Sequence, residues 1–146
     1  MIRLLTLLVL LLSGCGGSEV TNNNHGYGDY YDVRGDSGLA LRYSPTFDQN
    51  DPLARVGRYE TEFNEVMACT GITAPPPMVI VKPNGSLRPY DGYYYPDPDL
   101  IVVEPGTLTV TFKHELVHYL LDRSTGDLDP HHKSYLFLKC SSHGVT

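Results

Sequence analysis

Apolar side chains recur at intervals of three and four residues over two stretches of the chain, which is the spacing of one helix face. The first stretch covers residues 52–69, where Asp51 can cap a helix, Pro52 suits its first position and Gly71 can end it. Its recurring apolar positions are Leu53, Val56, Phe63, Val66 and Met67. The pattern predicts a helix from about residue 52 to residue 69.

The second stretch, residues 106–122, carries apolar positions on two helix faces. One face holds Phe112, Leu116 and Leu120, and the other holds Val110, Val117 and Leu121. A helix that is apolar on two faces is buried on most sides. A last helix is predicted to open with Asp129 as cap and Pro130 at its first position, and to run to about Cys140.

Short runs between these helices predict strands. Residues 39–44 alternate in polarity, and residues 78–81 and 100–103 are apolar and β-branched. A turn is expected at Asn84-Gly85, and tyrosines 93–95 lie just before the last of these strands. The order of helix, small sheet, helix and helix predicts an α+β domain.

The first 14 residues are typical of an export signal peptide. Arg3 supplies a positive start, and residues 4–12 are apolar but too short to span a bilayer. The sequence LSGC at residues 12–15 resembles the lipobox of bacterial lipoproteins, which implies cleavage before Cys15 and a lipid on its thiol. Gly16 after the cysteine implies outer-membrane sorting within the bacterial cell envelope. The alternative is an ordinary secretory signal with a chance cysteine.

Composition divides the rest of the chain. Residues 15–38 are rich in Gly, Asn, Asp and Ser without apolar periodicity, which predicts a flexible tether between the lipid anchor and a folded domain over residues 39–146. The 146 residues hold 11 Lys and Arg against 17 Asp and Glu, with no basic block. This charge balance argues against nucleic acid as a partner. The sequence does not indicate the oligomeric state.

Cysteine usage agrees with export. Beyond Cys15, the chain holds one pair, Cys69 and Cys140. In an oxidising compartment an even pair is expected to form a disulfide, with two buried free thiols as the alternative.

Residues 114–118, within the second helix, form an H-E-x-x-H motif. Four residues of helix turn through about 400°, so His114 and His118 lie one above the other and can share one Zn²⁺. Glu115 lies about 100° around the helix, where it can act as general base toward a zinc-activated water. Two buried structural histidines beside an exposed glutamate are the alternative interpretation.

A catalytic zinc site needs a third protein ligand and an open position. The residues at the positions where metzincins have Gly and His are Leu121 and Ser124, which excludes that clan. The remaining candidates lie downstream of the motif. They are His131, His132, the poorly placed His143 and the carboxylates Asp127 and Asp129.

A resemblance narrows this choice. The motif, the following Gly-Asp turn and the pattern D-x-x-H-x-S-x-x-F-x-x-C resemble a group of small bacterial zincin-like lipoproteins with metallopeptidase motifs. On this chain the pattern falls on Asp129, His132, Ser134, Phe137 and Cys140. The resemblance implies His132 as third ligand, with His131 as the alternative, and a compact zincin-like fold. In that fold the H-E-x-x-H helix lies behind a small sheet, and the third ligand lies on a following helix.

These observations lead to one expected function and one rival, beside a third interpretation as a purely structural envelope lipoprotein in which the motif occurs by chance. The expected function is a lipid-anchored zinc metallopeptidase that cleaves a peptide or protein substrate. Tyr93, Tyr94 and Tyr95 are weighed as a source of the group that stabilises the oxyanion, against a role in covering a surface. Tyr119 is expected to pack or to shape the pocket. The rival is a surface lipoprotein that contains zinc but binds a partner without catalysis.

Overall fold

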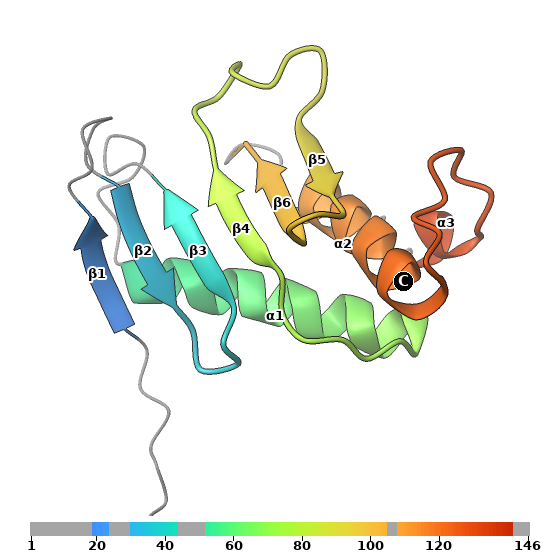
Figure 1. The fold of residues 1–146 in the computed structure, drawn as a ribbon, viewed down its shortest axis with the longest axis horizontal. Helices are drawn as coiled ribbons and strands as arrows, with labels where there is room; N and C mark the ends of the chain where they lie inside the picture. The colour runs from blue at the N-terminus through green and yellow to red at the C-terminus, as the bar shows by residue number, and fades with distance from the viewer. Residues whose placement is uncertain (1–18, 24–29, 44–51, 105–107, 142–146) are drawn as a thin grey trace, which may run out of the picture.

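The computed structural model describes residues 19–23, 30–43, 52–104 and 108–141, which form a mixed α+β fold (Figure 1). The strands are β1 (Glu19–Asn23), β2 (Tyr30–Arg34), β3 (Ala40–Tyr43), β4 (Met78–Val81), β5 (Gly92–Tyr95) and β6 (Leu100–Val103). The helices are α1 (Pro52–Thr70), α2 (Leu108–Thr125) and α3 (Leu136–Cys140). The α+β class predicted from the sequence is therefore confirmed for these residues.

The strands form one sheet in the order β1-β2-β3-β4-β6-β5. β3, β4 and β6 run parallel, and α1 makes the crossover from β3 to β4. β5 pairs antiparallel with β6 and forms one edge of the sheet. This edge lies over α2, so the helix that carries the H-E-x-x-H motif packs under the end of the sheet (Figure 1).

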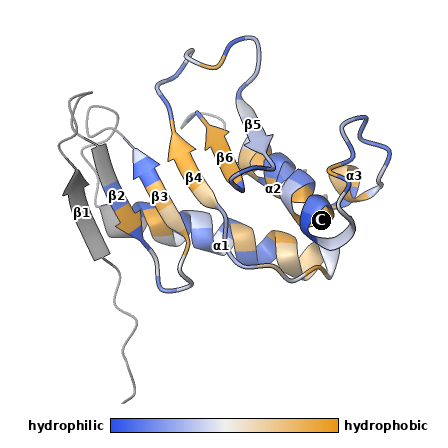
Figure 2. Cartoon of the chain, in the orientation of Figure 1, coloured by the Kyte–Doolittle hydropathy of each residue, from blue (hydrophilic) through white to orange (hydrophobic). Residues whose placement is uncertain are grey.

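Both long helices contribute to a single core on one side of the sheet. β3 and β4 alternate between partly exposed and buried positions, as expected for strands that face a core on one side only. Figure 2 shows β4 and β6, near the centre of the packed region, as hydrophobic over most of their lengths. The core joins Leu41, Val79 and Ile101 of the sheet to residues of α1 and α2 that include Phe63, Val66, Leu116 and Leu120.

The predicted strands at residues 39–44, 78–81 and 100–103 and the first two helices are confirmed, with shifts of a few residues at their ends. Gly71, with φ of 74°, follows α1, and Gly126, with φ of 73°, follows α2. Glycine adopts this left-handed conformation without steric penalty, so it ends a helix readily. Asp51, the expected cap of α1, lies outside the described residues.

The prediction of a flexible tether over residues 15–38 is wrong where the structure describes that segment. β1 and β2 lie within it and pair with the sheet, and the side chain of Val33 is buried in the core. The sheet therefore begins before Leu39, the predicted start of the domain, and α1 follows three strands. The predicted signal peptide of residues 1–14 and the predicted lipidation site at Cys15 lie outside the described residues.

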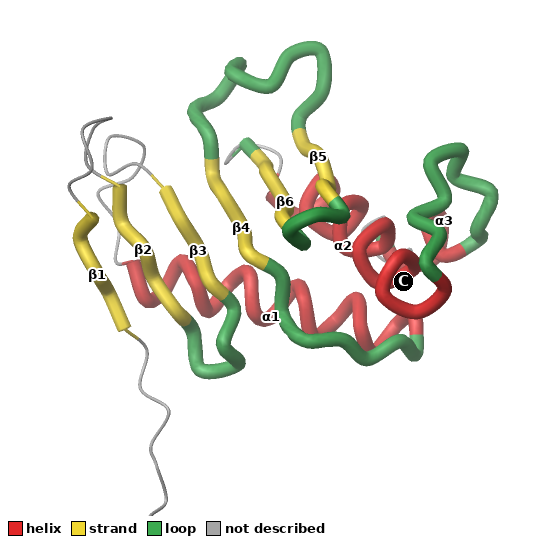
Figure 3. The backbone as a smooth tube through the Cα atoms, viewed as in Figure 1, coloured by secondary structure: helices red, strands yellow, loops and turns green. Residues whose placement is uncertain are grey.

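The prediction of a helix from Asp129 to Cys140 is also wrong for its first half. Residues 129–135 form turns, and α3 begins only at Leu136 (Figure 3). Asp129 and His132 have φ of 51° and 53°, which a right-handed helix does not permit. The Asp129 carboxylate accepts a hydrogen bond from the backbone N–H of Ser134, at 2.6 Å. This bond stabilises a loop and does not cap a helix as predicted.

The predicted disulfide is confirmed between Cys69 at the end of α1 and Cys140 at the end of α3. A helix of five residues is too short to be stable alone, so α3 depends on such contacts. Lys139 adds a second link, because its ammonium donates to the carbonyl of Cys69 at 3.3 Å. The bridge therefore holds α3 against α1.

Replacing Cys140 with serine should lower the free energy of unfolding by roughly 4 kcal/mol, because the bridge closes a long loop in the unfolded chain. Equilibrium denaturation in urea without reductant measures this loss. Cys69→Ser and the double variant should fall to the same value as Cys140→Ser. An unchanged denaturation midpoint in Cys140→Ser would contradict the assignment of a stabilising bridge.

Candidate metal centre

The side chains of His114, His118 and His132 converge on one point. The Nε2 atom of His132 lies 3.1 Å from Nε2 of His114 and 3.0 Å from Nε2 of His118. Two of these rings come from successive turns of α2, and the third comes from the loop between α2 and α3. Among the described residues, these three histidines form a group whose ligand atoms could hold a metal ion.

Two of the three separations between these nitrogens suit a small metal ion. Nitrogens bound tetrahedrally to zinc at about 2.05 Å lie about 3.3 Å from one another. The observed distances of 3.0 and 3.1 Å are close to that value. His132 is exposed while His118 is buried, so solvent reaches the His132 side of the group. Three ligands with an open position are typical of a catalytic metal site.

The protonation states of His114 and His118 also suit metal binding. Burial, followed by the proximity of His118 and His132, lowers the pKa of His114 to about 4, and burial lowers the pKa of His118. Nδ1 of His118 donates to the carbonyl oxygen of Leu128 at 2.6 Å. This bond places the proton on Nδ1 and leaves the lone pair of Nε2 facing the other rings.

The loop before α3 selects His132 over its neighbour. The carboxylate of Asp127 accepts from the N–H of Asp129 at 2.8 Å, and Asp129 holds Ser134 as described above. The backbone N–H of His132 donates to the carbonyl of Asp129 at 3.0 Å. His132 has a positive φ, which is uncommon for residues other than glycine, and such conformations concentrate at functional sites.

The alternatives for the third position have other environments. His131 is exposed and does not belong to the histidine group. Asp127 and Asp129 use their carboxylates to order the loop. His143 lies outside the described residues.

Glu115, the residue after His114 on α2, is buried beside this group. Its side chain is 8% exposed, and burial raises its pKa to about 7. A hydrogen bond from the backbone N–H of Tyr94, on the edge strand β5, opposes that rise. A carboxyl with a pKa near neutrality can accept and release a proton under physiological conditions, which is what a general base requires.

Gly92 allows β5 to approach the motif closely. A Cβ atom at this position would lie 2.5 Å from Cγ2 of Thr111 and 3.3 Å from Cγ of Glu115. Real Cβ atoms essentially never come as near as the first of these distances. The missing side chain therefore lets the edge strand lie against α2, where the Tyr94 N–H reaches Glu115.

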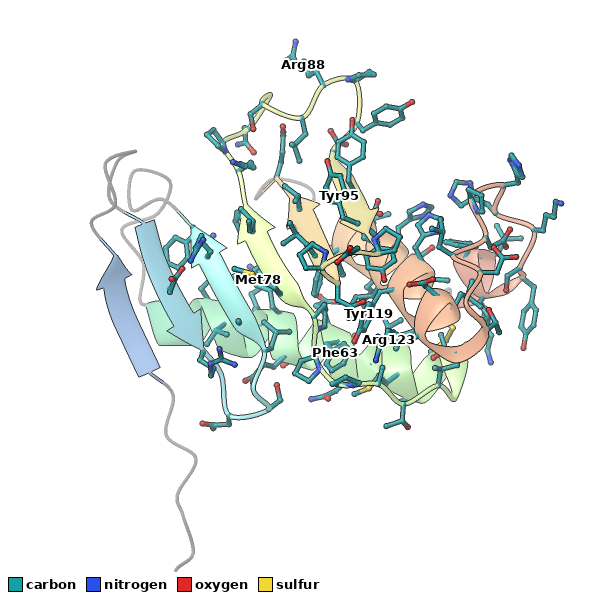
Figure 4. The ribbon with its side chains drawn as sticks, viewed as in Figure 1. Phe63, Met78, Arg88, Tyr95, Tyr119 and Arg123 are labelled. Carbon is teal, nitrogen blue, oxygen red and sulfur yellow. A yellow bond between two sulfur atoms is a disulfide. The ribbon has the colours of Figure 1, made fainter. Side chains whose placement is uncertain are left out.

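The tyrosines of β5 have structural contacts. The hydroxyl of Tyr94 donates to Asp122 at 2.8 Å, and that of Tyr93 donates to the carbonyl of Leu87 at 3.5 Å. Tyr95 (Figure 4) is 47% exposed. The described contacts of Tyr93 and Tyr94 thus support the loop before β5 and the end of α2 rather than an oxyanion. Tyr119 (Figure 4) is buried and donates to the carbonyl of Pro75, so the prediction that it packs is confirmed.

A separate cavity of about 490 Å³ lies at the other end of the sheet. Asp32, Arg34, Arg42 and Met78 are among its lining residues. Two of these form a bidentate ion pair, since the guanidinium of Arg42 contacts both carboxylate oxygens of Asp32 at 2.6 and 2.8 Å. Because its charged groups already have partners, this cavity offers less to a ligand than the histidine group does.

Three contacts of the candidate metal centre were not foreseen from the sequence. They are the Leu128 carbonyl on His118, the Tyr94 N–H on Glu115, and the packing of Phe137 against the histidine rings. The first two involve backbone atoms, for which side-chain identity gives no signal. Phe137 did carry a signal, since it occupies a fixed place in the pattern that follows the motif.

Comparison of the chain with protein-family models, with curated proteins and with solved structures found no match. Among the described residues, no helix is both long enough and apolar enough to cross a membrane.

Proposed function

We propose that this protein is a zinc-dependent metallopeptidase with a zincin-like fold. The observation that carries the proposal is the convergence of the His114, His118 and His132 Nε2 atoms beside the buried carboxyl of Glu115. Three imidazoles in such a group suit zinc, since imidazole is among its preferred ligands. The position of the H-E-x-x-H helix beneath a sheet edge also supports the zincin-like assignment.

Each residue has a definite task in this proposal. The three histidines would hold the metal, which supplies a Lewis acid and an activated water when bound. Glu115 would take the proton of the attacking water and pass it to the leaving amine. The Tyr94 N–H holds the Glu115 carboxylate at the edge of the sheet, and Leu128 fixes the orientation of the His118 ring.

We also propose that the domain acts on peptide or protein substrates at the bacterial cell envelope, anchored through a lipid on Cys15. The lipobox-like sequence at residues 12–15 supports the anchor, and the confirmed Cys69–Cys140 bridge is consistent with export to an oxidising compartment. Metabolic labelling with a fatty-acid analogue would test the anchor, with Cys15→Ala as the unlabelled control.

Metal removal tests the proposed function directly. The purified protein should hold close to one zinc per chain by elemental analysis and should cleave members of a broad peptide library. A chelator should abolish the cleavage, and added zinc should restore it. Protein that neither contains nor takes up zinc would overturn the proposal.

A further inference from the structure

Phe137 is the one side chain in the described structure whose ring contacts all three histidine rings. Its ring centroid lies 5.1 Å from that of His114, 4.6 Å from that of His118 and 4.7 Å from that of His132. The interplanar angles of 46°, 56° and 83° show that it touches each imidazole in a different orientation. All three distances fall within the range of favourable aromatic pairs.

The position of Phe137 is itself tightly fixed. Its side chain is 6% exposed, and it lies on α3 three residues before Cys140. The disulfide therefore anchors the same short helix that carries this ring. On the other side of α3, the hydroxyl of Ser134 accepts from the N–H of Leu136 at 3.3 Å, which joins the helix to the His132 loop.

The contacts of Phe137 restrain the rotation of the three histidine rings. An imidazole ring can rotate about its side-chain bonds, and each rotation moves Nε2 away from the shared point. Leu128 restrains His118 by a hydrogen bond, and no such hydrogen bond is seen for His114 or His132 among the described contacts outside the group itself. A single apolar ring packed against all three limits those rotations and keeps water from one side of the group.

We propose that Phe137 is a positioning residue that sets the geometry of the metal centre. It acts through the three histidines and does not touch substrate. The inference rests on the proposed metal site and goes beyond it. It states that the rigidity of the three histidine rings depends on α3, the short helix that the disulfide fixes in place. Loss of the ring should loosen all three imidazoles while the core between the sheet and the long helices stays packed.

The test compares Phe137→Leu and Phe137→Met with Phe63→Leu. Phe63 is buried in the core on α1 (Figure 4) and makes none of these ring contacts with the histidines, so its replacement matches the loss of a buried aromatic. Zinc affinity is measured by competition with a chromophoric chelator at a temperature where circular dichroism shows every variant folded. Cobalt spectra of the same samples report the ligand geometry.

Both Phe137 variants should weaken zinc binding by about 10- to 100-fold, the range seen when groups that support metal ligands are removed. Their cobalt absorption bands should shift or broaden. Phe63→Leu should lower the melting temperature and keep zinc affinity within about threefold of wild type.

Two results would overturn the inference. One is wild-type affinity and an unchanged cobalt spectrum in either folded Phe137 variant. The other is an equal loss of affinity in Phe63→Leu, which would show a general effect of core packing. Wild-type protein that binds neither zinc nor cobalt would instead overturn the proposed function, so the two failures are distinguishable.

Discussion

Replacing His132 with alanine is expected to weaken zinc binding by more than 100-fold, whereas replacing His131 should leave it unchanged. The Nε2 atom of His132 lies at 3.0 and 3.1 Å from those of the other two histidines, and His131 lies outside the group. Loss of a direct ligand should exceed the 10- to 100-fold loss typical of residues that only support a ligand. Elemental analysis after dialysis and a chelator competition measure the difference.

The neighbouring histidines make this a closely matched pair. Both substitutions remove one imidazole from the same exposed loop, so effects on solubility or on the net charge of the loop should be equal. The melting temperature of each metal-free variant checks that the loop change has not unfolded the domain. Equal zinc loss in the two variants, or greater loss in His131→Ala, would contradict the ligand assignment.

The two histidines of α2 could be placed from the sequence because their relation is local. Residues four apart on a helix share a face whatever surrounds the helix, so the motif itself fixes His114 and His118. The third ligand depends on the path of the chain after α2. Asp129 and His132 both adopt positive φ, which the predicted capping pattern did not indicate, and residues 129–135 form a loop where a continuous helix was expected.

The strands β1 and β2 were not predicted from the sequence for a related reason. β2 contains Asp32 and Arg34 beside Val33, and its flanks are rich in glycine, so its pattern resembles that of a linker. Its stability comes from pairing with β3, including the ion pair of Asp32 with Arg42 on the neighbouring strand. Such pairing joins residues that are distant in sequence, and strand preference depends strongly on that context.

The environment of Glu115 explains why the motif tolerates a buried carboxyl. An ionised carboxylate in an apolar site needs partners, and among those described the N–H of Tyr94 is one. Burial outweighs this hydrogen bond, which is why the pKa rises to about 7. Burial therefore keeps the pKa of Glu115 near neutrality, and it lowers the stability of the metal-free protein at pH values where the carboxyl is ionised.

The destabilisation caused by the buried Glu115 carboxylate depends on pH. An unfolded glutamate ionises at the ordinary pKa of 4.5, and the folded one at about 7. Between these values the unfolded state loses its proton first, so stability falls as pH rises, and the full loss is present above pH 7. The stability advantage of metal-free Glu115→Gln over wild type should thus grow by on the order of 1–3 kcal/mol as the pH rises from 4.5 to 8, as measured by urea denaturation.

Glu115→Gln is expected to lower peptide hydrolysis by about 10²- to 10⁴-fold while zinc affinity stays within a few-fold of wild type. Glutamine keeps the size of the side chain and a hydrogen-bond acceptor for the Tyr94 N–H, but it cannot take a proton from water. Cleavage of the preferred library peptide and zinc content, measured on the same samples, separate the two effects.

Glu65→Gln serves as the control for this experiment. Glu65 lies on α1, is largely exposed and pairs with Lys113, which keeps a second partner in Glu62. Because Glu65 is exposed and Lys113 keeps its pair with Glu62, this variant should stay folded and retain wild-type cleavage. If Glu115→Gln cleaves as fast as wild type, Glu115 is not the general base. If wild type binds zinc and cleaves no peptide, the domain is a zinc-containing binding protein, and its histidine group serves to hold the loop before α3 for a partner.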